Sequence, residues 1–234
     1  MRHTSQAEAL AWEVELPGKR SSLSWGAKPK GTLLIGSDPA DAERIPIPVA
    51  VARILTSKKK AGEIHPLSRA ELLYMVREVS KACARSRIER LIDRREYASD
   101  EVRHKLHEDG YAASTIDACV SRAEEAGLIS DQRFADSFIR SKVFAGWGMM
   151  RIARELSSRG IDVSQVDGWP YEYLDPDDET QRAYEVASSR RVSGTRAYEK
   201  LVRYLMGRGF SSGVAHRAAH RIIEEQDDGD LVDF

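Results

Sequence analysis

The sequence predicts a mainly α-helical protein, an elongated array of tandem three-helix repeats with a small β-containing module at its N-terminus. Three observations lead to this prediction: a change of composition near residue 66, helical spacing of apolar residues after it, and a glycine framework that occurs three times. The 234 residues are 41% hydrophobic, which suffices for one sizeable domain or two small ones. No apolar run reaches about 18 residues, so we expect no membrane span, no secretory signal and a cytoplasmic location.

Residues 1–66 differ in composition from the rest of the chain, because they hold six of the eight prolines. Three short apolar or alternating runs are typical of strands, at residues 12–16, 31–36 and 45–51. Pro46 and Pro48 cannot donate ladder hydrogen bonds, which confines the last run to a sheet edge or to the start of a strand. Residues 58–62 are expected to form a turn. We therefore predict a small β-containing module or leader over residues 1–66.

After residue 67 the apolar residues recur at helical spacing. Ser68 and Glu71 stand three residues apart just before an apolar run, which is the pattern of a capping box. Ser99 and Ser114 precede further apolar faces and are expected to cap the next two helices. These signals predict a first group of helices between residues 67 and 129.

A glycine framework occurs three times in the helical part. Each copy has an aliphatic residue, another four later, a glycine four after that, and then an apolar residue. The glycines are Gly110, Gly160 and Gly209, which stand 50 and 49 residues apart. A helix that ends at a left-handed glycine, followed by an apolar residue that folds back, explains the pattern. The period fits three helices per repeat and predicts repeats over residues 67–129, 130–176 and 177–226, then an acidic tail over 227–234.

Motifs for catalysis and cofactor binding are weak. The sequence has no P-loop, no dinucleotide-binding fingerprint and no nucleophile elbow, so we predict no catalytic residue and no cofactor. Two histidine pairs have helical spacing without further ligands, His104 with His107 and His216 with His220, so no metal site is expected. Cys83 and Cys119 are expected to be reduced thiols.

The net charge of −1 hides an uneven distribution. Residues 224–234 hold six acidic residues and no basic one, so the rest of the chain carries +5. Arginines outnumber lysines by 26 to 10. Arginine suits bidentate contacts with carboxylates and phosphates, although a GC-rich genome would produce the same excess. Two interpretations stay open: a mixed solvated surface, or a surface that meets phosphates or an acidic protein.

Basic residues on the predicted repeat helices, together with one tryptophan, form the candidate partner-binding or DNA-binding set. Trp147 lies between two glycines, which predicts either a packed loop anchor or an exposed stacking residue. Arg151 and Arg154 share a helix face and are the first choice, although Arg151 could instead pair with Glu155. The full set is Arg94, Arg95, Arg103, Lys105, Arg140, Lys142, Trp147, Arg151, Arg154, Arg159, Arg196, Lys200 and Arg203.

Two stretches of the second repeat carry a resemblance to a known family. The first reads GLISDQRFA over residues 127–135, and the second reads GWGMMRIAREL over residues 146–156, followed by Gly160 and Ile161. The first repeat shows a weaker version of the same pattern. Together these motifs resemble the RecX family of regulatory proteins of bacterial recombination, from about residue 55 to residue 223.

The resemblance implies a non-enzymatic, monomeric regulator in homologous recombination, DNA repair and the SOS response. It implies that the chain binds the RecA recombinase, lodges in the groove of the RecA–DNA filament, and inhibits ATP hydrolysis and strand exchange. Single- or double-stranded DNA is a second candidate partner, and no membrane partner is expected. Asp109 stands where the family usually has a basic residue, so the first repeat should contribute less to an anionic partner. Two alternatives remain: a DNA-binding helical-repeat protein without a recombinase partner, and an enzyme such as a nuclease.

Overall fold

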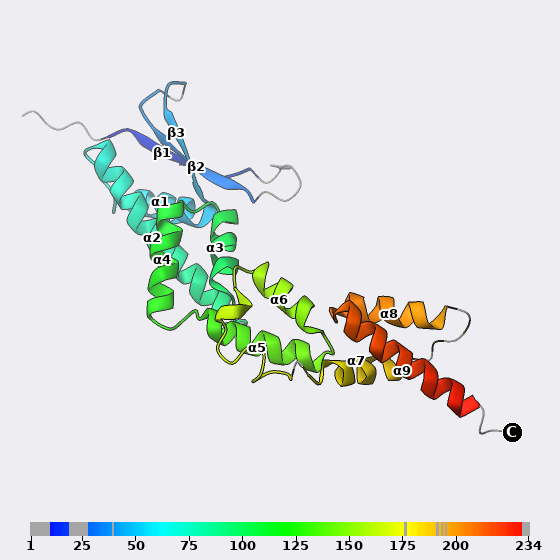
Figure 1. Ribbon diagram of the computed structural model, residues 1–234. Coiled ribbons are helices and arrows are strands. Elements are labelled where there is room, and N and C mark those ends of the chain that lie inside the picture. Colours follow the sequence, from blue (N-terminus) through cyan, green and yellow to red (C-terminus); the bar gives the residue numbers. More distant parts are fainter. Residues whose placement is uncertain are drawn as a thin grey trace, which may run out of the picture. The chain divides into compact units, whose positions relative to one another are not determined.

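The structure is a computed structural model that describes residues 10–18, 28–38, 40–175, 177–190, 192, 194 and 196–230, the last four by their backbone alone. Residues 1–9 and 19–27 of the predicted N-terminal module or leader, and the last four residues of the predicted acidic tail, lie outside this part. The chain forms two compact units that divide between Ile129 and Ser130, where the second repeat is predicted to begin. No helix in the described ranges combines the length and apolar character needed to cross a membrane. Figure 1 labels the elements, which are mainly helices with a small sheet near the N-terminus, and this part of the predicted fold class is confirmed.

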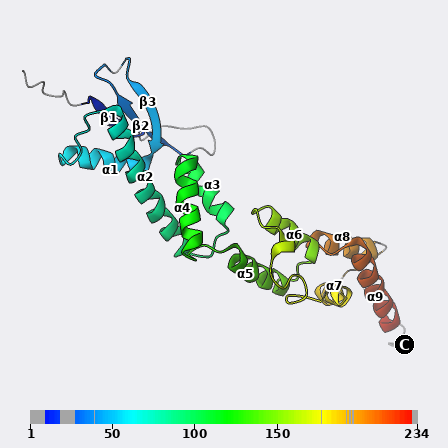
Figure 2. The same cartoon turned by 60° about the vertical axis from the view of Figure 1, so that its left-hand side comes forward.

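The first unit begins with a small antiparallel sheet in the order β1–β2–β3. Its strands are β1 (Trp12–Glu15), β2 (Lys30–Ile35) and β3 (Glu43–Pro48). Pro46 and Pro48 both lie in β3, an edge strand, as their missing N–H groups require. Helix α1 (Val49–Lys60) packs across the sheet, as Figures 1 and 2 show.

Helix α1 is a correction to the sequence prediction, which placed strand residues up to 51 and a turn at residues 58–62. Pro48 is the N-cap of α1. Proline is tolerated there because N–H groups at the start of a helix have no partner within the helix. Val51 and Leu55 lie one turn apart and are buried. The three lysines that suggested a turn form the last turn of the helix, where positive charge favours the helix dipole.

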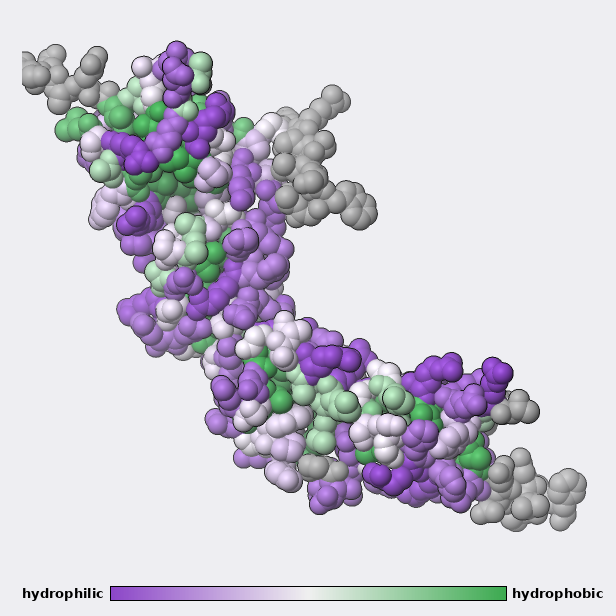
Figure 3. Space-filling model, turned by 45° about the horizontal axis from the view of Figure 1, so that its top comes forward, coloured by the Kyte–Doolittle hydropathy of each residue, from purple (hydrophilic) through white to green (hydrophobic). Residues whose placement is uncertain are grey.

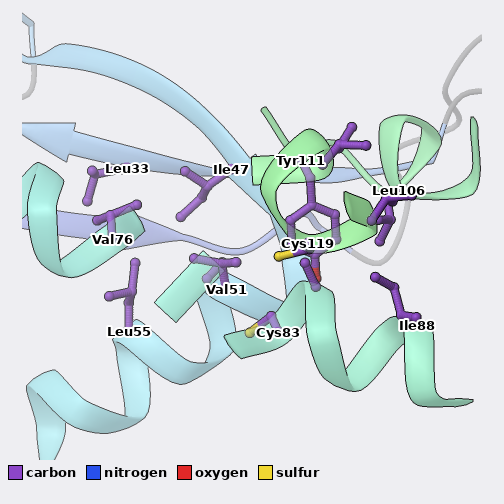
Figure 4. Packing of buried hydrophobic residues seen from close by; sticks show 14 of the residues in the cluster. Leu33, Ile47, Val51, Leu55, Val76, Cys83, Ile88, Leu106, Tyr111 and Cys119 are labelled. Atoms are coloured by element: carbon purple, nitrogen blue, oxygen red, sulfur yellow. The ribbon is translucent and has the colours of Figure 1, made fainter. Parts of the chain in front are cut away.

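The first repeat consists of α2 (Arg69–Ile92), α3 (Ser99–Glu108) and α4 (Ala113–Glu125). Its apolar side chains continue the core of the sheet and α1, and Figure 4 shows this packing around Val51, Val76 and Leu106. The Ser68 hydroxyl accepts the Glu71 N–H at 3.2 Å, which confirms that cap.

The caps predicted at Ser99 and Ser114 are wrong. The N-caps are Ala98 and Ala112, and neither helix has a side-chain cap. Ala98 is fully buried. Core packing therefore places the N-cap of α3 one residue before Ser99, the cap predicted from the sequence. Ser99 is itself 8% exposed within the first turn.

The second unit contains α5 (Asp131–Phe144), α6 (Met149–Ser157), the 3₁₀ helix η1 (Val163–Gln165), α7 (Glu179–Ser188), α8 (Ala197–Arg208) and α9 (Ser212–Asp230). In the second repeat the short η1 stands in place of a full third helix. Gly168 has a φ of +75° and Pro170 follows it, and both residues interrupt a helix. Helix α9 runs four residues beyond the predicted end of the third repeat at residue 226.

The repeated glycines have the predicted conformation. Gly110, Gly160 and Gly209 have φ values of +91°, +78° and +93°. The next residue in each copy is buried and donates its N–H to the framework leucine at 3.1 to 3.2 Å: Tyr111 to Leu106, Ile161 to Leu156 and Phe210 to Leu205. The glycine thus ends a helix with a Schellman-type bond, and the following apolar residue folds back on the core.

Candidate partner-binding surface

The turn between α5 and α6 places Trp147 between two tightly packed glycines. Gly146 has a φ of +71°, and a Cβ there would lie 2.9 Å from a methyl group of Val186. A Cβ on Gly148 would lie 2.4 Å from the carbonyl group of Gly209. Only glycine fits these contacts, so the Gly-Trp-Gly sequence lets the turn approach the third repeat closely.

Trp147 is a half-buried anchor of this turn. The guanidinium of Arg151, on α6, lies 3.7 Å from the centre of the indole ring. The ammonium group of Lys142, on α5, lies 5.0 Å from the same centre. Phe138 meets the indole edge-on at 6.3 Å. The structure therefore brings three of the sequence-predicted residues together, and they form a cation–π cluster at the end of α5 and the start of α6.

Several polar contacts join this turn to the third repeat; we call them the repeat junction. Two are backbone bonds, from Gly148 N–H to the Arg208 carbonyl at 2.9 Å and from Met150 N–H to the Gly209 carbonyl at 3.1 Å. Three more run from arginines to backbone carbonyls: Arg151 to Gly207 at 3.3 Å, Arg182 to Trp147 at 2.9 Å and Arg208 to Ala145 at 2.7 Å. Arg151 thus has a structural role between the repeats.

Glu179 and Arg182, which sequence reasoning missed, complete the repeat junction from α7. The Glu179 carboxylate is 4% exposed and accepts the Met149 N–H at 2.9 Å. It caps α6, whose own N-cap Gly148 has no side chain to do so. Burial lowers the pKa of Arg182, and its Nη1 has no hydrogen-bond partner among the described residues. No local sequence signal could reveal a cap donated from 30 residues away.

The alternative that paired Arg151 with Glu155 is wrong. Arg159 holds Glu155 instead, at 2.9 Å, and this hydrogen bond lowers the pKa of the carboxyl group. The Arg159 guanidinium also lies 5.1 Å from the ring centre of Phe138. Arg159 therefore makes its contacts at the C-terminal end of α6, whereas Arg151 contributes to the repeat junction at the N-terminal end of α6.

Four candidate cations of the second unit remain free. Arg154 on α6 is exposed and forms no ion pair with any residue that the structure describes, and the same holds for Arg196, Lys200 and Arg203. Arg196 is the N-cap of α8, and Lys200 and Arg203 stand three residues apart on one face of that helix; we call these three residues the α8 cations. Figure 3 shows hydrophilic residues together with smaller apolar areas on the surface of the second unit.

A shallow groove of about 530 Å³ borders Arg203 on the same repeat. Tyr198, Met206 and His216 line it, and the Tyr198 hydroxyl lies 2.7 Å from Nδ1 of His216. Met206 is 50% exposed. An apolar floor beside free cations suits an acidic partner with apolar side chains.

The remaining candidates have neighbours of their own. Arg95 stacks on Tyr97 at 3.6 Å and pairs with Glu101, and Lys105 lies 5.7 Å from the same ring. The other paired cations are Arg103 with Asp117 at 2.7 Å and Arg140 with Asp136 at 2.9 Å. Arg94 is exposed in the turn after α2 and pairs with no described residue. Of the first-repeat candidates, Arg95 and Arg103 are thus neutralised by ion pairs within the protein, whereas Arg94 and Lys105 are not.

The described residues meet few of the requirements of a metal site or of a reactive thiol. Among the residues with described positions, no three His, Cys, Asp or Glu side chains are grouped so as to hold a metal ion. Cys83 and Cys119 are buried free thiols whose pKa values are raised by burial. Thiols of this kind react slowly.

Comparison with known proteins places this geometry in a family. Residues 130–167, which include α5, α6 and the turn between them, match the family model for the second three-helix domain of RecX. "Regulatory protein RecX" of Vibrio vulnificus is 36% identical over 126 residues, which are 52% of this chain and 80% of that protein. The chain belongs to the RecX family. A relative of the same name from Chromohalobacter salexigens is 34% identical over 137 residues, 56% of this chain and 88% of that protein.

Solved RecX structures show the same fold. A crystal structure of regulatory protein RecX matches with a TM-score of 0.53 and 17% identity, covering 88% of this chain and 96% of its own. RecX from Lactobacillus salivarius matches with a TM-score of 0.51 and 20% identity, covering 63% of this chain and 97% of its own. These likenesses and the family membership confirm the resemblance found in the sequence.

Proposed function

We propose that this RecX-family chain binds the RecA recombinase or the RecA–DNA filament and inhibits its ATPase and strand-exchange activities. The observation that carries the proposal is family membership, since relatives named as regulatory proteins align along most of their length. The chain acts in the cytoplasm, as a monomer, by occupying the filament without turnover or cofactor. Its role belongs to homologous recombination and DNA repair.

The surface that contacts the filament comprises Arg154 and the α8 cations. These side chains have no ion pair within the described protein, so they can pair with acidic groups or phosphates without breaking internal contacts. Most of the other candidates contribute less, because binding through them would first cost an existing ion pair or stacking contact; Arg94 of the first repeat has neither and is a further free cation. Such an interface weakens as salt rises.

The experiment is RecA ATPase on single-stranded DNA with the full chain titrated in. Occupancy predicts inhibition that scales with the ratio of this protein to filament, and no nucleotide or DNA product from the protein alone. Unchanged ATPase and strand exchange at saturating protein would rule out the proposal. Product formation by the pure protein would instead establish an enzyme.

A DNA-binding protein without a recombinase partner is the second candidate, and the α8 cations favour it. Arg196 at the N-cap of α8, with Lys200 and Arg203 in the helix, offers three cations without ion pairs in the described protein to a phosphate backbone. A pull-down with RecA in the absence of DNA separates the two candidates. Retention of RecA supports the regulator, whereas binding to DNA alone supports the second function.

A further inference from the structure

A cavity of about 370 Å³ lies within the first unit, between the N-terminal module and the first repeat. Three cations line it, Lys28 before β2 and Arg87 and Arg90 on α2. The first turn of α1 and the side chains of Asp109 and Tyr111 complete the wall. None of these residues belongs to the surface proposed for the filament.

Positive charge exceeds negative charge in the cavity wall. Asp109 accepts hydrogen bonds from Lys28 at 2.6 Å and from Arg87 at 2.8 Å, and Glu108 reaches Lys28 from outside the wall at 3.4 Å. Arg90 forms no ion pair with any described residue. At least one guanidinium is therefore available to an anion that enters the cavity.

The start of α1 adds backbone N–H donors to the same wall, of which that of Val49 is already used by the pairing of Lys30 with Pro48 in the sheet. Val49 and Ala50, its first residues, line the cavity. The N-cap Pro48 provides no side-chain bond, and the first turn contains no acidic residue. The first N–H groups of a helix lack partners inside the helix and favour an anion through the helix dipole.

Tyr111 supplies an independent sign of a missing ligand. Its side chain is 5% exposed, yet its hydroxyl makes no hydrogen bond to any residue that the structure describes. Tyr111 is one of the residues that line the cavity. Figure 4 shows the ring extending from the turn between α3 and α4 toward the α2 side of the core. A buried phenol normally has a partner.

We propose that this cavity binds an oxyanion of the phosphate type, held by Arg90, the Tyr111 hydroxyl and the N–H groups that follow Val49 in the first turn of α1. Burial raises the pKa of Tyr111, so the phenol is a neutral donor at physiological pH. A tetrahedral oxyanion accepts hydrogen bonds from several directions at once, which matches donors on three different elements. The phosphate group could come from a small phosphate compound or from the DNA backbone, and the experiment distinguishes these sources.

The experiment measures the thermal unfolding of the full chain in phosphate against chloride at equal ionic strength, and phosphate affinity by calorimetry. Wild type should melt at a higher temperature in phosphate, because a ligand that binds only the folded state stabilises it. Arg90→Gln and Tyr111→Phe should each weaken phosphate binding, Arg90→Gln by roughly tenfold or more. The matched control is Arg85→Gln, an exposed cation on the same helix that does not line the cavity.

A gain-of-affinity variant sharpens the test. Asp109→Asn removes the one carboxylate among the described residues of the wall and should tighten phosphate binding several-fold. No difference between phosphate and chloride, or equal losses in Arg90→Gln and Arg85→Gln, would overturn the proposal. A short single-stranded oligonucleotide that competes with phosphate, in a manner dependent on Arg90, identifies DNA as the source. Phosphate binding without such competition identifies a small phosphate compound.

Discussion

Gly148 and Gly209 pack backbone against backbone where the second repeat meets the third. A Cβ on Gly148 would lie 2.4 Å from the carbonyl group of Gly209, and a Cβ on Gly209 would lie 2.1 Å from the Cβ of Arg151. Gly209 therefore has two tasks. It ends α8 with a φ of +93°, and it leaves room for the start of α6.

The first prediction separates these two tasks of Gly209. Gly127 also has a positive φ, +68°, but no atom lies within 4 Å of the place where its Cβ would stand. Gly127→Ala should lower the free energy of unfolding by about 1 kcal/mol, the cost of a left-handed alanine. Gly209→Ala adds steric overlap, which costs a further 1–3 kcal/mol or so. Urea unfolding of both variants checks this, and equal losses would contradict the close packing.

The second prediction concerns the cap that α7 gives to α6. Glu179→Ala removes the acceptor for the buried Met149 N–H and should lower the free energy of unfolding by about 1–3 kcal/mol. Glu179→Gln keeps an acceptor oxygen and should recover part of this loss. The control is Glu185→Ala, an exposed carboxylate on the same helix. If the thermal melting of Glu179→Ala matches that of the control, the cap does not stabilise the fold.

The third prediction is a pH dependence that arises at Asp109. Burial opposes ionisation of this carboxyl group, but hydrogen bonds from Lys28 and Arg87 outweigh it, so its pKa lies below the usual value. Its stabilisation is then complete above the unfolded pKa of about 3.9 and is lost as the pH falls through the folded pKa. Asp109→Asn should be less stable at neutral pH and should lose less stability on acidification below about pH 4. Chemical unfolding at a series of pH values tests this, and parallel curves for the two proteins would refute it.

The parts of the fold that local sequence controls could be predicted. The three framework glycines set helix ends because only glycine takes their backbone conformation without strain. The edge position of β3 follows from its two prolines in the same way. Each of these features depends on a few neighbouring residues, so no knowledge of the tertiary structure was needed.

Features that depend on distant contacts could not be predicted. Helix α1 begins at a proline within an apolar run that also suits a strand, and packing on the sheet decides between them. The role of Arg151 is a second example, since its partners are an indole ring four residues before it and a carbonyl 56 residues after it. Helical spacing places Arg151 and Arg154 on one face, but it does not show that only Arg154 is free.

The last prediction separates the cations that hold the protein together from those that are free to bind. Arg151→Glu should lower the melting temperature, because it loses both the stack on Trp147 and the bond to the Gly207 carbonyl. Lost RecA inhibition in that variant would therefore not identify a contact.

Lys200→Glu combined with Arg203→Glu breaks no internal ion pair in the described protein, so it should melt like wild type. It should nevertheless need roughly tenfold more protein for half-inhibition of the RecA ATPase, because two attractive contacts become repulsive. Neutralising the same two residues should reduce the salt dependence of binding, by about two in the logarithmic slope if they meet phosphates. If the folded double variant inhibits at the wild-type ratio, the α8 cations are not the contact, and Arg154 on α6 becomes the residue to test.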